Sequence, residues 1–118
     1  MKLFDSELKL MELIWADEGC SAKALSLAAA EQIGWNKNTT YTVLKKLVEK
    51  GAVERVEPGF HCRALVSRDR VAQEETEGLI DKLFRGSRQA FFAAFLENEK
   101  LSGEELEALR TMIDRYEE

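Results

Sequence analysis

Apolar residues recur at steps of three and four positions through the first 50 residues of the chain. Because an α-helix turns once every 3.6 residues, this spacing places the apolar side chains of each segment on one face. The pattern predicts three helices, over residues 6–16, 21–33 and 38–50. In the first helix, the expected core-facing side chains are Leu8, Met11, Ile14 and Trp15.

Residues that commonly cap helices stand at the ends of these segments. We expect the N-caps to be Asp5 or Ser6, Ser21 and Asn36, because their side chains can accept hydrogen bonds from the free N–H groups of a first helical turn. Gly34 and Gly51 follow the second and third segments and mark their ends, as glycine does after many helices.

The period changes to two beyond residue 51. The stretches AVERV (52–56) and FHCRALV (60–66) alternate apolar and polar residues, as half-buried strands do. Glu57-Pro58-Gly59 lies between them and is typical of a hairpin turn. Three helices followed by a hairpin is the element order of a winged helix-turn-helix, which we predict for residues 1–70.

Helical periodicity returns in residues 71–118, where we expect helices over about 69–85 and 87–98 and a last one from Ser102. Ser102 and Glu105 have the spacing of a capping box. These short helices carry more large apolar side chains than they can bury among themselves, so the segment is predicted to form a two-fold homodimer. The expected interface residues are Leu79, Leu83, Phe84, Phe91, Phe92, Phe95, Leu106, Leu109 and Ile113.

Charge is distributed unevenly along the 118 residues, whose formal net charge is −5. Residues 1–35 carry three Lys/Arg against six Asp/Glu, residues 36–70 carry eight against four, and residues 71–118 carry six against twelve. The basic middle third coincides with the third helix and the hairpin. The overall acidity therefore does not exclude a nucleic-acid partner for that part of the chain.

The third helix has one apolar and one polar face. With Thr40 at the centre of the buried stripe, Leu44, Leu47, Val48 and Gly51 lie within about 80° of it. On the opposite face, Asn38, Thr39 and Thr42 are short enough to reach DNA base edges. Lys45, Lys46 and Lys50 can reach phosphates. The full set of expected backbone contacts is Asn36, Lys37, Tyr41, Lys45, Lys46, Arg55 and Arg63.

Other interpretations of these residues remain open. Thr and Asn at a helix start are often only caps, lysines on a helix are usually solvated, and a winged helix can dock a protein partner without binding DNA. His61 is the single histidine, and neighbouring Cys62 points to the opposite strand face, so a nucleophilic triad or a zinc site is not expected. We predict no enzyme activity, no cofactor, no small-molecule substrate, and reduced structural thiols.

A resemblance covers nearly the whole chain. SELKLMELIW (6–15), NTTYTVLKKLVEKGAVER (38–55) and FFAAFLENEKLSGEELEALRTMID (91–114) resemble the penicillinase and methicillin-resistance repressor family of bacterial winged-helix regulators (BlaI/MecI-like). The resemblance implies a dimeric transcriptional repressor on a palindromic double-stranded DNA operator. It also implies derepression through a membrane-linked metalloprotease, with a cut between Ala94 and Phe95, where the family has Asn in place of Ala94. With no apolar run long enough for a membrane span or a signal peptide, we expect a cytoplasmic protein.

Overall fold

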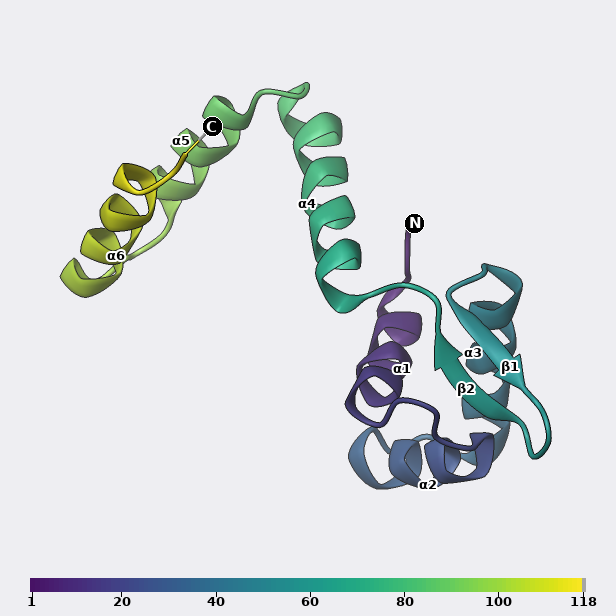
Figure 1. The fold of residues 1–118 in the computed structure, drawn as a ribbon. Coiled ribbons are helices and arrows are strands. Elements are labelled where there is room, and N and C mark those ends of the chain that lie inside the picture. Colours follow the sequence, from purple (N-terminus) through teal and green to yellow (C-terminus); the bar gives the residue numbers. More distant parts are fainter. Residues whose placement is uncertain (118) are drawn as a thin grey trace. The chain divides into compact units, whose positions relative to one another are not determined.

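The computed structural model describes residues 1–117, and it is mainly helical with one antiparallel hairpin (Figure 1). The elements are α1 (Asp5–Ala16), α2 (Ala22–Gln32), α3 (Lys37–Glu49), β1 (Val53–Val56), β2 (His61–Ala64), α4 (Arg68–Phe84), α5 (Arg88–Asn98) and α6 (Gly103–Asp114). This order confirms the predicted winged helix-turn-helix followed by helices. The chain divides into two compact units, Met1–Thr76 and the residues from Glu77 onward, and α4 runs from the first into the second.

The first unit is built around α3. This helix contacts α1, α2 and β1, while α1 also contacts α2 and β2, so the three helices and the hairpin enclose one core (Figure 1). Aliphatic side chains dominate that core, as the transfer of apolar area out of water requires. Its fully buried large side chains include Leu10, Met11, Ile14, Leu25, Leu44 and Leu47.

The backbone of residues 20–22, where the loop after α1 leads into α2, forms hydrogen bonds with the outer edge of the hairpin beside β2. Within the hairpin, Val53 pairs with Ala64 and Val56 with His61. The Cys62 N–H donates to the Cys20 carbonyl at 2.8 Å, and the Ala22 N–H donates to the Phe60 carbonyl at 2.8 Å. These bonds satisfy backbone groups of Phe60 and of Cys62 in β2 that a two-stranded hairpin would leave open to water, and they fix the wing to the helical core.

The two cysteines meet at this edge. Cys20 and Cys62 are buried free thiols, which matches the expected reduced state. Burial raises the pKa of Cys62 to about 12, with the Cys20 thiol beside it adding to the effect. His61 points the other way, is exposed, and places its Nδ1 2.9 Å from the Gly19 carbonyl.

The start of α1 differs from the prediction. The N-cap is Phe4, not Asp5 or Ser6, and its N–H donates to Glu7 Oε1 at 2.7 Å. The buried face is also rotated: Glu7 and Leu10 are buried, and Leu8 is 37% exposed. The pattern alone favoured Leu8 because it is apolar and Glu7 is charged. The prediction was wrong because a partner 43 residues away holds the Glu7 carboxylate inside.

That partner is Lys50, the C-cap of α3. Its Nζ lies 2.6 Å from Glu7 Oε1 and 3.0 Å from the Lys2 carbonyl, and 4.4 Å from the centre of the Phe4 ring. Burial raises the pKa of Glu7, but the hydrogen bonds from Lys50 and from the Phe4 N–H outweigh it and hold that pKa below its ordinary value. Glu7 Oε2 is buried without a hydrogen-bond partner among the described residues, so the carboxylate depends on Oε1 and its two donors.

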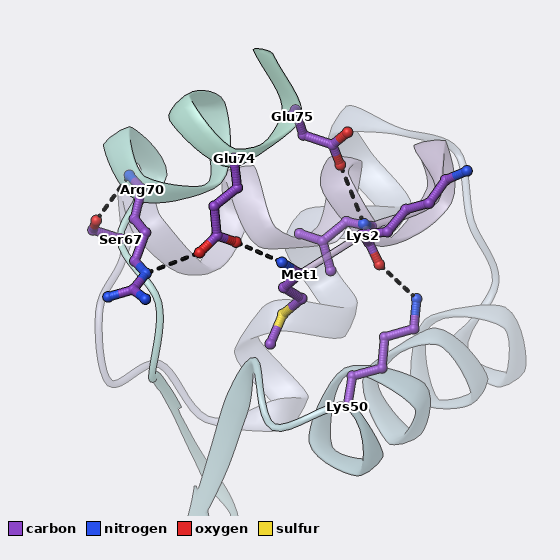
Figure 2. Close-up of polar contacts among 8 residues, drawn as sticks. Met1, Lys2, Lys50, Ser67, Arg70, Glu74 and Glu75 are labelled. Carbon is purple, nitrogen blue, oxygen red and sulfur yellow. Dashed lines mark hydrogen bonds and ion pairs between the residues drawn. The ribbon is translucent and has the colours of Figure 1, made fainter. Parts of the chain in front are cut away.

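The N-terminal segment also contacts the first turns of α4 (Figure 2). The α-amino group of Met1 lies 2.5 Å from Glu74 Oε2, and Arg70 Nε lies 3.0 Å from Glu74 Oε1. These two cations hold the pKa of Glu74 below its ordinary value. The Leu3 N–H donates to Glu75 Oε1 at 3.3 Å. Residues 1–3 therefore connect the start of α4 to Lys50 at the end of α3.

The second unit buries little of its apolar surface. The rings of Phe84 and Phe91 meet edge to face at 5.7 Å, and Phe91 also contacts Phe92 and Phe95. Ser102 and Glu105 form the predicted capping box at the start of α6. Neither α5 nor α6 has a buried residue. The helices therefore present an apolar surface that this one chain does not cover.

Candidate nucleic-acid interface

The head of α3 is organised by its polar side chains. Asn36 is the N-cap, as predicted, and its Oδ1 accepts from the Thr39 N–H at 2.8 Å. The Thr40 hydroxyl donates to the Asn36 carbonyl at 3.2 Å, which satisfies this buried side chain within the helix. Thr and Asn have low helix propensity, but here they provide the cap that starts the helix.

The buried face of α3 largely follows the predicted stripe. Thr40, Leu44 and Leu47 are at most 1% exposed, and Val48 is half-buried. The prediction was wrong for Gly51, which is exposed because it lies beyond the helix end with φ of +80°. Val43, which was not predicted, completes the buried stripe.

The opposite face of α3 is exposed along its whole length. Asn38, Thr39, Thr42, Lys45 and Lys46 all lie there, as the helical rotation predicted. The Thr42 hydroxyl donates to the Asn38 carbonyl at 2.8 Å. Its proton is therefore used inside the helix, and the methyl group and an oxygen lone pair remain available to a ligand. A thymine methyl is the DNA group that such a methyl contacts.

The lysines of α3 fall into two groups. Within the described part of the chain, Lys45 and Lys46 take part in no ion pair, so their ammonium groups are available to an anionic ligand. Lys50 does not join them, contrary to expectation, because it is bound to Glu7 and the Lys2 carbonyl. Apart from Lys37 at its start, the positive charge of α3 that is in no ion pair among the described residues thus lies in the C-terminal half of the helix, where Lys46 belongs to the last turn.

A row of cations and aromatic rings joins α3 to the wing. Lys37 Nζ lies 5.8 Å from the centre of the Tyr41 ring, and Tyr41 meets Phe60 edge to face with ring centres 6.3 Å apart. The Arg55 guanidinium lies over the Phe60 ring at 3.9 Å. Phe60 takes φ of +50° in the turn, which is rare for an aromatic residue. The row brings three predicted contacts, Lys37, Tyr41 and Arg55, together near the start of α3.

The arginines of the basic middle third are paired with carboxylates. Arg55 pairs with Glu57, two residues further on at the start of the turn, and Arg63 pairs with Glu54 directly opposite it in the hairpin. Beyond the wing, Arg68 Nε lies 3.0 Å from Glu12 Oε1, and Arg70 pairs with Glu74. The positive charge counted along the sequence is therefore partly neutralised in the fold. The charge count missed this pairing. The observed loop spans residues 57–60, one residue longer than the predicted turn, and the resulting register sets Glu54 opposite Arg63.

Among residues 1–117, no three His, Cys, Asp or Glu side chains are grouped so that they could hold a metal ion. No helix in this range combines the length and apolar character needed to cross a membrane.

Comparison with known proteins relates this geometry to a family. The sequence profile of the penicillinase repressor family matches residues 3–115. The chain belongs to the penicillinase repressor family. The penicillinase repressor of Bacillus licheniformis is 23% identical over 117 residues, which are 98% of this chain and 91% of that protein. The methicillin resistance regulatory protein MecI of Staphylococcus aureus (strain N315) is 25% identical over 116 residues, 97% of this chain and 94% of the relative.

The fold of the first unit is also that of a solved structure. The DNA-binding domain of the repressor BlaI, determined in solution, superimposes with a TM-score of 0.54 and 23% identity over 57% of this chain and 84% of that domain. At this identity the match establishes the winged-helix fold. It agrees with the hairpin and the three helices described above, and the family match extends the relationship to α5 and α6.

Proposed function

We propose that this protein is a cytoplasmic, homodimeric transcriptional repressor that binds a palindromic DNA operator. In this proposal residues 1–70 bind DNA and residues 71–118 pair two chains. The observation that carries the proposal is the exposed face of α3, where Asn38, Thr39 and Thr42 lie beside Lys45 and Lys46, which form no ion pair with any residue that the structure describes. Because the chain belongs to a repressor family, DNA is the expected ligand of this face.

The chemistry of the α3 face suits a DNA groove. Short amide, hydroxyl and methyl groups at the N-terminal half of a recognition helix can approach base edges, and Asn38 can form a bidentate contact with adenine. Lys45 and Lys46, one to two turns further on, can neutralise phosphates of the flanking backbone. Asn36, Lys37, Tyr41 and the wing arginines would contact the backbone on either side.

Dimerisation is supported by the uncovered apolar surface of the second unit. Leu83 is 64% exposed, Phe92 57% and Ile113 73%, whereas single-chain cores hide such side chains. A second copy of the same segment would cover them in a closed, two-fold arrangement. Two linked winged helices bind two half-sites together, which raises the apparent affinity by about 10²–10⁴ without new contacts.

Release from the operator by proteolysis is the further step that this proposal includes. The bond between Ala94 and Phe95 lies inside α5, and the Ala94 carbonyl accepts a hydrogen bond from Asn98 Nδ2 at 2.7 Å. A protease needs an extended substrate, so a membrane-linked metalloprotease antirepressor would act on a locally unwound α5. The cut would separate α6 from the remaining interface and weaken dimerisation without altering α3.

Docking to a protein partner is the second candidate function, and the paired arginines of the wing favour it. Selection of bound duplexes from a random pool, with the mass of the complex measured in solution, distinguishes the two. We expect enrichment of a palindrome whose half-sites lie about one helical turn apart or a multiple of it, bound by two chains. A protein that stays monomeric at micromolar concentration and enriches no duplex at low salt would refute the proposal.

A further inference from the structure

The wing holds its two arginines in different ways. Arg63 lies opposite Glu54 in the hairpin, and its Nε donates to Glu54 Oε2 at 2.8 Å. Arg55 is held on two sides, by the Glu57 carboxylate and by the face of the Phe60 ring. Each guanidinium therefore has a carboxylate partner on the wing itself, before any ligand is bound.

Both pairs are exposed to solvent. The side chains of Arg55 and Glu57 are 54% and 56% exposed, and those of Arg63 and Glu54 are 58% and 44% exposed. Exposed ion pairs contribute only about 0–1 kcal/mol, because water and salt screen them. A phosphate can compete for such an arginine, but the released glutamate then stays close to the DNA backbone and repels it.

This arrangement contrasts with that of α3. Among residues 1–117, Lys45 and Lys46 form no ion pair with a carboxylate, so their ammonium groups can bind phosphates without first leaving a partner. In the wing, each positive charge is accompanied by a negative one within contact distance. The positive potential that draws any duplex to the protein should therefore come from the recognition helix and much less from the wing.

We propose that Glu54 and Glu57 restrain the sequence-independent affinity of the wing for DNA, so that binding depends more strongly on the face of α3. This inference rests on the proposed function, because it requires the wing to lie near a DNA backbone. Glu54 and Glu57 are then residues that limit binding to random DNA, and Phe60 keeps Arg55 in place while its partner changes from carboxylate to phosphate.

The test is the affinity of the full chain for a random duplex, measured by fluorescence anisotropy across a salt series. The variant Glu54→Gln/Glu57→Gln should bind about tenfold more tightly at low salt, and the slope of log affinity against log salt should steepen by about one to two, since up to two more phosphates are neutralised. Glu97→Gln/Glu104→Gln is the matched control. It changes the net charge equally on exposed residues of α5 and α6 and should leave the slope unchanged.

Arg55→Ala/Arg63→Ala provides the second arm. Combined with Glu54→Gln/Glu57→Gln, it should remove the gain in affinity and return the slope to that of the original chain or below. If the glutamine variant behaves as the control does, while the original chain binds duplexes, the inference about Glu54 and Glu57 is overturned and the proposed function stands. If the original chain binds no duplex at any salt concentration, the proposed function itself fails.

Discussion

Replacing Lys50 with methionine should destabilise the first unit, because it leaves a carboxylate buried without its cation. Glu7 is 1% exposed, and its Oε2 already lacks a hydrogen-bond partner among the described residues. Breaking a buried ion pair by removing one side costs about 3–5 kcal/mol. Because the Lys50 side chain is itself 30% exposed, part of the interaction is screened, and we expect a loss of about 2 kcal/mol at pH 7.

Urea unfolding followed by tryptophan fluorescence measures this loss. Trp15 and Trp35 are half-buried against the core of the first unit, so their emission should report on its unfolding. About 2 kcal/mol corresponds to a fall in melting temperature of about 10 °C for a unit of this size. Lys45→Met is the matched control. It removes a lysine from the exposed face of the same helix, where no ion pair is lost, and should change the free energy of unfolding by less than about 0.5 kcal/mol.

The pH dependence of the free energy of unfolding shows whether the buried charge of Glu7 causes the loss of stability in Lys50→Met. In the original chain the pKa of Glu7 lies below its ordinary value of 4.5, so its stabilising effect is present above that pH and is lost as the pH falls through the lowered pKa. Without Lys50, burial should dominate and raise that pKa. The variant should then be least stable at neutral pH and approach the original chain as the pH falls toward 4.

Glu7→Gln gives a second check, because the amide oxygen can still accept from the Phe4 N–H. At neutral pH the combined variant Glu7→Gln/Lys50→Met should be more stable than Lys50→Met alone, since no buried charge remains. A loss for Lys50→Met that equals the Lys45→Met control, or one that does not change with pH, would refute the reasoning.

Three further predictions concern the α3 face, the dimer and the thiols. Thr42→Ala should weaken binding to the selected operator by about 1–3 kcal/mol and leave the affinity for random duplexes unchanged. Lys46→Ala should weaken binding to the operator and to random duplexes by similar factors. If anisotropy titrations show the same pattern of losses for the two variants, the assigned roles are contradicted. Phe92→Asp should shift the protein from dimer to monomer in sedimentation and lower operator affinity by about 10²-fold or more; an unchanged mass would remove Phe92 from the interface. Because the pKa of Cys62 is raised from 9.0 to about 12, its stabilising effect is present below pH 9 and should be lost as the pH rises toward 12. Cys62→Ala should weaken this alkaline dependence in unfolding measurements without abolishing it, because burial also raises the pKa of Cys20; an unchanged dependence would contradict the role of Cys62.

Local sequence rules predicted the parts of the fold that depend on neighbours in the chain. Ser21, Asn36 and Ser102 cap helices as expected, because a cap needs only the first turn that follows it. The change from helical to alternating periodicity located the hairpin. The excess of large apolar side chains in the short helices of residues 71–118 identified the segment in which several of them remain exposed.

Long-range pairing could not be predicted in the same way. The burial of Glu7 depends on Lys50, which lies 43 residues away, and no periodicity reveals that pair. Counting charges placed a basic surface on the wing, but the fold sets Glu54 against Arg63 and Glu57 against Arg55. The predicted turn, 57–59, would set Cys62 opposite Glu54, whereas the observed loop, 57–60, sets Arg63 there. A difference of one residue in the loop therefore decides this pair.

The central claim is that the outer face of α3 reads DNA sequence. The most direct measurement compares the affinities of Asn38→Ala/Thr39→Ala/Thr42→Ala and of the original chain for the selected operator and for a random duplex of equal length. The account predicts that the original chain prefers its operator strongly, and that the triple variant retains its random-duplex affinity and loses most of this preference. A triple variant that still discriminates the operator as the original chain does would contradict it.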